Sequence, residues 1–176
     1  MDALIGSTLK TYKSETTLLW DCDCSWVASN LMKKAKQNIF TTTYKMEPKG
    51  IPKAKNVNKM ISQLVAANYR GLDVKVLMNF QQNKKATSSV NWYAASALAK
   101  RNLKSKYLTS GRILHSKIII IDFDIVIIGS HNWSVLSHCR NIEFSVLIKS
   151  EVINKEMREK FLDMWDNSTE FPIRKT

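Results

Sequence analysis

The side chains best suited to chemistry lie at the ends of two apolar runs within Ile113–Ser134, which reads ILHSKIIIIDFDIVIIGSHNWS. His115 and Lys117 precede the first run, and Ser130 and Asn132 follow the second. Side chains alternate between the two faces of a strand, so each pair shares one face. A neutral imidazole is a nucleophile or base, and lysine and asparagine can bind phosphoryl oxygens as negative charge develops. The set predicts phosphoryl chemistry at one rim of a sheet.

A structural explanation competes with this one. From His115 and Lys117 alone, a histidine with satisfied hydrogen bonds beside a surface lysine is the simpler interpretation. Asp122 has the opposite parity to His115 on a straight strand, so we expect it to lie away from the pair. Gly129 comes directly before Ser130 and lets backbone or ligand approach closely. Spacing over the whole stretch must therefore decide between the two interpretations.

Several strands and helices are needed to position these residues. Hydrophobic periodicity predicts strands at 17–20, 38–44, 74–80, 103–108, 113–122, 125–130 and 144–148, and helices at 26–37, 56–69, 90–101 and 151–166. We expect loops at 45–55 and 81–89, and a turn at 122–124 that joins two strands into a hairpin. Strands that alternate with helices predict an α/β fold, with a mixed sheet covered on both faces. We expect one domain over residues 1–176.

The spacing of the polar residues resembles a known family. HSKIIIID has the form H-x-K-x-x-x-x-D, and six residues separate Asp122 from GSHN. This pattern resembles the HKD motif and the following G-S-x-N element of the phospholipase D superfamily. The flanking segments NIFTTTYKM, VIIGSHNWS and NIEFSVLI follow in the usual order. The resemblance covers about Trp20 to Trp165, is strongest to small Nuc-like endonucleases with one motif per chain, and implies an α/β/α sandwich.

The resemblance implies a role for each motif residue. His115 would attack phosphorus and form a covalent phosphohistidine. Lys117 and Asn132 would bind the phosphate oxygens of the substrate, and Ser130 would support the site by hydrogen bonding. No metal and no cofactor is implied. The mechanism would therefore be that of a metal-independent phosphodiesterase.

Two acidic residues belong to the same pattern. Glu143, in NIEF, would hold the second ring nitrogen of His115 and so set its tautomer. A carboxylate that enters an apolar strand needs a partner, which agrees with that role; the alternative is a charge at the edge of a strand. Asp122 is a member of the motif and stands among the candidate catalytic residues, although its parity favours a structural role.

The implied mechanism uses two histidines, one to attack and one to protonate the leaving oxygen. This chain carries one motif, so twofold pairing would bring a second His115 to a shared site. We therefore expect a homodimer. The alternatives within one chain are His131, which strand parity turns away from the site, and His138, which we expect at the surface.

Charge indicates the class of partner. The formal net charge is +12, and the span from Asn30 to Ile121 holds 18 Lys and Arg against two acids. A basic body suits nucleic acid, DNA or RNA, before an anionic membrane, and a lysine-rich surface without a partner is the plain alternative. Trp92, Tyr93 and Tyr107 lie near basic runs and could stack on bases, although a division between core and surface is simpler.

Three further function classes stay open. A lipid phosphodiesterase would use the same catalytic residues, and a cleavage subunit of a restriction or defence system would change only the context. A binding module without catalysis would need no nucleophilic histidine.

The cysteines and the N-terminal residues bear on the cellular compartment of the protein. Three cysteines argue against a disulfide framework and for a reducing compartment. DCDC at Asp21–Cys24 does not have the spacing of a common zinc site. The segment MDALIGSTLKTYKSE does not read as a signal peptide, and no apolar run is long enough to span a membrane. We expect a cytoplasmic protein.

Overall fold

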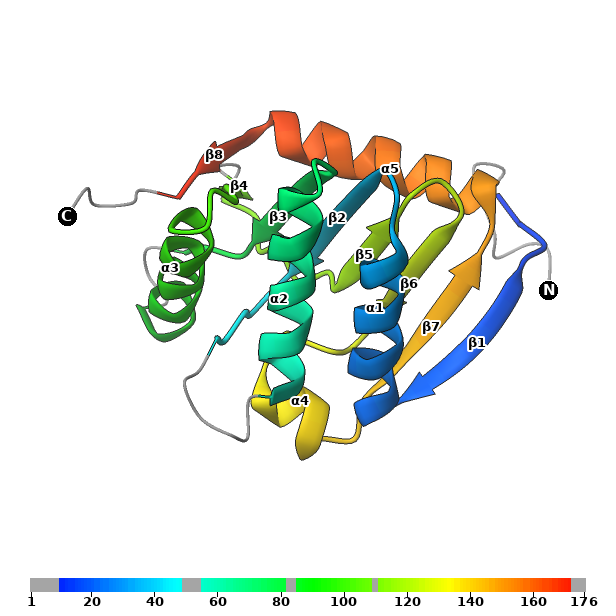
Figure 1. Ribbon diagram of the computed structural model, residues 1–176, viewed down its shortest axis with the longest axis horizontal. Helices are drawn as coiled ribbons and strands as arrows, with labels where there is room; N and C mark the ends of the chain where they lie inside the picture. Colours follow the sequence, from blue (N-terminus) through cyan, green and yellow to red (C-terminus); the bar gives the residue numbers. More distant parts are fainter. Residues whose placement is uncertain (1–9, 49–54, 82–84, 109–110, 172–176) are drawn as a thin grey trace.

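One sheet organises the chain. The computed structural model describes residues 10–48, 55–81, 85–108 and 111–171, whose eight strands form a sheet in the order β1-β7-β6-β5-β2-β3-β4-β8 (Figure 1). The strands are β1 (Glu15–Trp20), β2 (Asn38–Thr43), β3 (Asp73–Met78), β4 (Ser105–Leu108), β5 (Ile118–Ile121), β6 (Ile125–Gly129), β7 (Phe144–Lys149) and β8 (Ser168–Glu170). The three strands β2, β3 and β4 are parallel, and the remaining pairs are antiparallel. The predicted mixed sheet is confirmed.

Helices cover both faces of this sheet. They are α1 (Cys22–Lys34), α2 (Lys55–Tyr69), α3 (Lys85–Ala99), α4 (Val135–Cys139) and α5 (Glu151–Asp166). Helices α1 to α4 lie on one face, whereas α5 runs along the opposite face (Figure 1). The predicted α/β/α arrangement is therefore confirmed, and none of the helices in the described ranges is long and apolar enough to cross a membrane.

The run of four isoleucines serves both cores. Ile119 and Ile121 pack in the cluster under α1 and α2, and Ile118 and Ile120 pack in the cluster under α5. Strand side chains alternate, so a strand buried on both faces needs apolar residues at every position. Strand β5 pairs with β6 through the predicted turn after Ile121, which confirms the hairpin.

Several predicted boundaries were wrong. The strand predicted at 113–122 is only β5. Earlier in this segment, the Leu114 N–H donates to the Asn79 side chain and not to a neighbouring strand. Helix α1 begins and ends earlier than predicted, and α3 begins at Lys85, inside the predicted loop. The sequence analysis missed α4 and β8, which are short. Residues 49–54 and 82–84 of the two predicted loops lie outside the described residues.

Candidate active site

His115 and Lys117 lie together in the extended segment that leads into β5. His115 is exposed and Lys117 is half-buried. The Lys117 Nζ donates to the His115 carbonyl oxygen at 2.6 Å and lies 3.1 Å from His115 Nδ1. Burial lowers the pKa of Lys117, and the negative charge of Glu143 opposes that shift. An ammonium group therefore stands beside an accessible imidazole, as phosphoryl chemistry requires.

Two residues that the sequence analysis did not select hold this segment. The Tyr44 ring lies 5.0 Å from the His115 ring, centre to centre, and Lys117 Nζ lies 5.7 Å from the centre of the same tyrosine. Buried Asn79 accepts the backbone N–H of Leu114 at 3.1 Å. Both residues directly follow parallel strands β2 and β3, and that position was the signal available in the sequence.

Ser130 follows β6 and is fixed by β7. Its N–H donates to the Phe144 carbonyl at 3.0 Å, and the Phe144 N–H donates to Ser130 Oγ at 3.2 Å. A Cβ added at Gly129 would overlap Ser145 Oγ and the Phe144 carbonyl, so only glycine fits between these strands. The close approach expected at Gly129 is thus an approach of backbone from β7.

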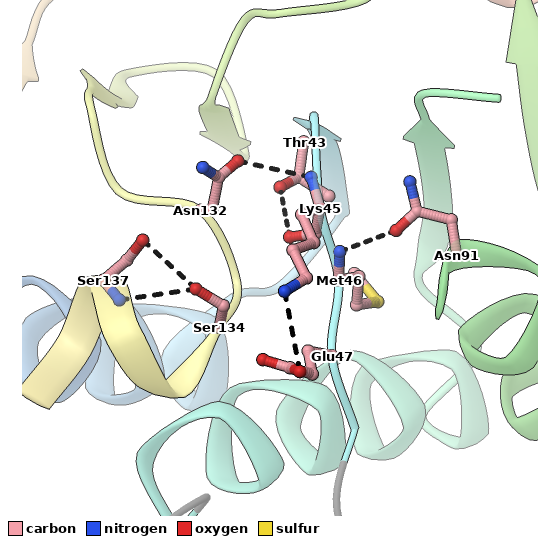
Figure 2. A network of polar contacts seen from close by, with 8 residues as sticks. All are labelled: Thr43, Lys45, Met46, Glu47, Asn91, Asn132, Ser134 and Ser137. Carbon is pink, nitrogen blue, oxygen red and sulfur yellow. Dashed lines mark hydrogen bonds and ion pairs between the residues drawn. The ribbon is translucent and has the colours of Figure 1, made fainter. Parts of the chain in front are cut away.

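Asn132 has a defined orientation. Its Oδ1 accepts the backbone N–H of Lys45 at 3.2 Å (Figure 2). An amide offers one acceptor and one NH₂ donor group, and the acceptor faces Lys45. Figure 2 shows the Asn132 nitrogen turned away from that bond. The NH₂ group is therefore the end presented to an anionic oxygen.

A buried network holds the segment that orients Asn132. The Trp133 N–H donates to the Lys45 carbonyl at 3.0 Å, and the Glu47 N–H donates to the Trp133 carbonyl at 2.8 Å. Fully buried Asn91, on α3, accepts the Met46 N–H at 2.8 Å (Figure 2). Helix α4 then begins at the Ser134 cap, whose Oγ accepts the Ser137 N–H. Asn91 is a further supporting residue that the sequence analysis missed.

Glu143 does not contact His115 within this chain, as far as the described residues show. Its carboxylate accepts from the Asn141 amide at 3.0 Å and from the Ser130 and Ser137 hydroxyl groups. Burial raises the pKa of Glu143, but these hydrogen bonds outweigh burial and hold the pKa below its ordinary value. The expected bond to the imidazole is thus corrected: the carboxylate faces Ser130 and α4.

Asp122 lies at the other end of β5 from His115. Its carboxylate accepts the backbone N–H groups of Lys36, Gln37 and Asn38 at 2.8–3.2 Å. Lys36 and Gln37 lie in the connection between α1 and β2, and Asn38 is the first residue of β2. Asp122 itself has a positive φ of 49°, in the turn of the hairpin. This motif residue therefore joins a loop to the sheet and does not meet the other candidates.

The other two histidines are buried. His131 is 4% exposed, and its ring nitrogens lie 2.8 Å from Ser145 Oγ and 2.9 Å from the Asp21 carbonyl. His138 is fully buried and stacks on His131, with ring centres 5.2 Å apart. The expectation that His138 lies at the surface was wrong, because α4 turns it inward. Burial lowers the pKa of His138 to about 4, and His131 acts in the same direction.

The DCDC segment does not gather into a metal site. Cys22 is exposed and donates to the His138 carbonyl, whereas buried Cys24 donates to Ser145 Oγ at 3.7 Å. Among the described residues, no three His, Cys, Asp or Glu side chains are grouped to hold a metal ion. The polar groups that precede β5 and follow β6 include the His115 imidazole, the Lys117 ammonium and the Asn132 amide.

Comparisons with known proteins agree on one family. Residues 29–165 match the family described as cardiolipin synthase, PLD-like domain. A cardiolipin synthase of Clostridium perfringens strain 13 is 31% identical over 133 residues, which are 74% of this chain and 26% of that protein. A phospholipase D of Rickettsia conorii is 27% identical over 161 residues, which are 92% of this chain and 72% of that protein. The chain spans about a quarter of the length of the cardiolipin synthases that it matches.

Two solved structures share the fold. Nuc from Salmonella typhimurium, a phospholipase D family member, has a TM-score of 0.74 at 22% identity and covers 90% of this chain and 99% of its own. NucT from Helicobacter pylori has a TM-score of 0.67 at 18% identity, over 90% of this chain and 100% of its own. With the family match over most of the chain, these likenesses lead to one conclusion: the chain belongs to the phospholipase D superfamily.

Proposed function

We propose that the protein is a metal-independent phosphodiesterase that hydrolyses DNA or RNA through a covalent intermediate on His115. The observation that carries the proposal is the exposed His115 imidazole in contact with Lys117 Nζ. The imidazole attacks phosphorus, a nitrogen–phosphorus bond forms, and the bond to the leaving oxygen breaks. An acid protonates that oxygen, and water then attacks phosphorus and releases His115.

The neighbouring side chains would stabilise the charge that develops on phosphorus. Lys117 and the Asn132 NH₂ group bind the non-bridging oxygens of the phosphate. Ser130 supports the site through its bonds to Phe144. Glu143 positions Ser130 and offsets the charge of Lys117 in the folded site. Asp122 would act through the fold, because its carboxylate bonds to the backbone at the start of β2, at the opposite end of β5 from His115.

Nucleic acid suits the charge of the chain. The span from Asn30 to Ile121 carries 18 basic residues against two acids. Lysine and arginine neutralise backbone phosphates without reading sequence. We therefore expect cleavage with little sequence preference and with a strong dependence on salt.

The acid would come from a second copy of the chain. The sequence has three histidines, and the 4% and 0% exposure of His131 and His138 keeps both from a substrate. Twofold pairing supplies a second His115 to one site, so that one copy attacks and the other protonates. This need for an outside acid is the reason to infer a homodimer.

An apolar surface lies in the right place for such pairing. On the face that α5 covers only in part, β1, β7 and β6 expose Leu18, Trp20, Phe144 and Ile128. The Trp20 and Phe144 rings lie 5.9 Å apart, centre to centre. These side chains amount to on the order of 400 Å² of apolar surface, which pairing would remove from water. The surface also adjoins the site, because Phe144 is bonded to Ser130.

A charge placed on this apolar surface tests the dimer. Trp20→Glu would bury a carboxylate at the interface, so we expect a monomer in sedimentation and loss of cleavage. Trp26→Glu is the matched control, because Trp26 is 63% exposed on α1, at the opposite face. A Trp20→Glu protein that stays dimeric and active would refute this surface.

The catalytic proposal is tested by cleavage with EDTA present. Wild type and His115→Ala are compared on single-stranded DNA, duplex DNA and RNA. Cleavage that survives the chelator and disappears in the variant supports the proposal, and chelator-sensitive cleavage contradicts it. The names of the curated relatives favour a second candidate, a lipid phosphodiesterase or transferase. Turnover of phosphatidylglycerol vesicles without any nuclease activity would reverse the order of the two.

A further inference from the structure

A groove of about 510 Å³ runs between α2 and α3, outside the candidate active site. Its floor is formed by apolar and small residues, namely Ile61, Val65, Ala66 and Ala97. Asn58 and Ser62 add polar groups, and Tyr69, Tyr93 and Arg101 form part of its wall. A lining that combines apolar and polar groups complements a nucleobase, which has an apolar face and a polar rim.

The two tyrosines are unusually open to solvent. Tyr69, the last residue of α2, is 66% exposed, and Tyr93 on α3 is 61% exposed. By contrast, Trp92 and Tyr107 pack against the core. Of the three aromatic residues that the sequence places near basic runs, only Tyr93 is therefore exposed. Exposed aromatic rings in one groove are platforms on which bases stack, irrespective of sequence.

The walls of the groove carry no negative charge. Helices α2 and α3 contain no Asp or Glu, whereas the chain as a whole has 15. Arg101 lines the groove, and both Arg101 and the preceding Lys100 follow the end of α3. The Arg101 Nη1 donates to the Ala97 carbonyl at 3.0 Å, which holds the guanidinium at the groove. Such a surface is complementary to a chain of phosphates.

A short segment of chain links the groove to the residues around Asn132. Pro48 lines it, and Pro48 directly follows the segment whose Lys45 N–H orients Asn132. Helices α2 and α3 lie on the face opposite to α5, so the apolar surface of β1, β7 and β6 is on the other side of the sheet (Figure 1). Pairing through that surface would leave the groove open.

We propose that the groove between α2 and α3 binds single-stranded nucleic acid beyond the scissile phosphate. Tyr69 and Tyr93 stack on bases, and Arg101 contacts the backbone. This inference rests on the proposed nuclease function and adds a second binding site to it. The consequence is a dependence on length: a strand that reaches the groove binds more tightly than one that fills only the active site.

The test compares Tyr69→Ala/Tyr93→Ala with Tyr69→Phe/Tyr93→Phe, each in a His115→Ala background that prevents cleavage. Binding of fluorescein-labelled oligothymidylates of about 4 and about 24 nucleotides is followed by anisotropy. Loss of one stacked base weakens binding by about tenfold. We expect the alanine pair to bind the long strand about a hundredfold less tightly and the short strand as before. The phenylalanine pair, which keeps both rings, should bind both strands like its parent.

Several outcomes would overturn the groove without touching the catalytic proposal. The first is a long strand that binds the alanine pair as tightly as the parent, while wild type still cleaves nucleic acid. The second is an equal loss in the phenylalanine pair, which would point to the hydroxyl groups or the fold. Hydrolysis of bis(p-nitrophenyl) phosphate by the tyrosine variants with an intact His115 should match wild type. Failure of wild type to bind or cleave any nucleic acid would remove the proposed function and the groove together.

Discussion

Substitution of Asp122 can distinguish a structural role from a catalytic one, because Asp122 belongs to the catalytic motif by spacing but lies away from His115. Asp122→Ala would leave the N–H groups of Lys36, Gln37 and Asn38 without their acceptor. Water can replace part of the loss at this half-buried position, so each bond contributes about 1 kcal/mol. The total is about 3 kcal/mol, or a fall in Tm of roughly 6–12 °C for a chain of this size.

The assay pairs thermal unfolding with cleavage measured well below Tm. Asp122→Ala should lose stability but retain kcat within a few-fold, since the folded fraction keeps its site. Asp122→Asn is the matched control, because asparagine tolerates the positive φ of 49° and keeps one acceptor oxygen. Its Tm should fall by about half as much as the Tm of Asp122→Ala. His115→Ala should do the reverse, with an unchanged Tm and no cleavage. An Asp122→Ala protein with wild-type Tm and a hundredfold lower kcat would refute this reasoning.

Two further predictions concern stability. Gly129→Ala would push against Phe144 and Ser145, so we expect about 3 kcal/mol of destabilisation and displacement of Ser130, read as a lower Tm and lower kcat. His138 has a pKa of about 4 in the fold against about 6.5 when unfolded, so the unfolded chain binds the extra proton. Stability should therefore fall by about 3 kcal/mol as the pH drops from 6.5 to 4. Urea unfolding at several pH values should show a flatter pH dependence of stability in His138→Phe than in wild type. The same pH dependence in both proteins would contradict the burial of His138.

Much of the fold was predictable because its strongest signals are local. The bounds of α5 match the prediction, since its apolar spacing is clear and Ser150 caps it. The isoleucine hairpin was predictable for the same reason. Helix α4 was missed because its five residues are too few to show a helical period, although the Ser134 cap was a usable signal.

Part of the geometry of the candidate site was predictable. Alternation along a strand placed His115 and Lys117 on one face, and the two side chains are in contact. The partners of Glu143 depend on how α4 folds back onto β7, and no local pattern encodes that packing. Asn79 and Asn91 escaped notice because a buried amide that bonds to backbone has no periodic signature.

The most direct test of His115 as the nucleophile is intact-mass analysis of the protein, quenched during turnover of an oligonucleotide with EDTA present. We expect a mass increase equal to one nucleotidyl fragment on wild type, located to His115 by peptide mapping and absent from His115→Ala. Cleavage without any adduct, or an adduct on another residue, would contradict the proposed mechanism.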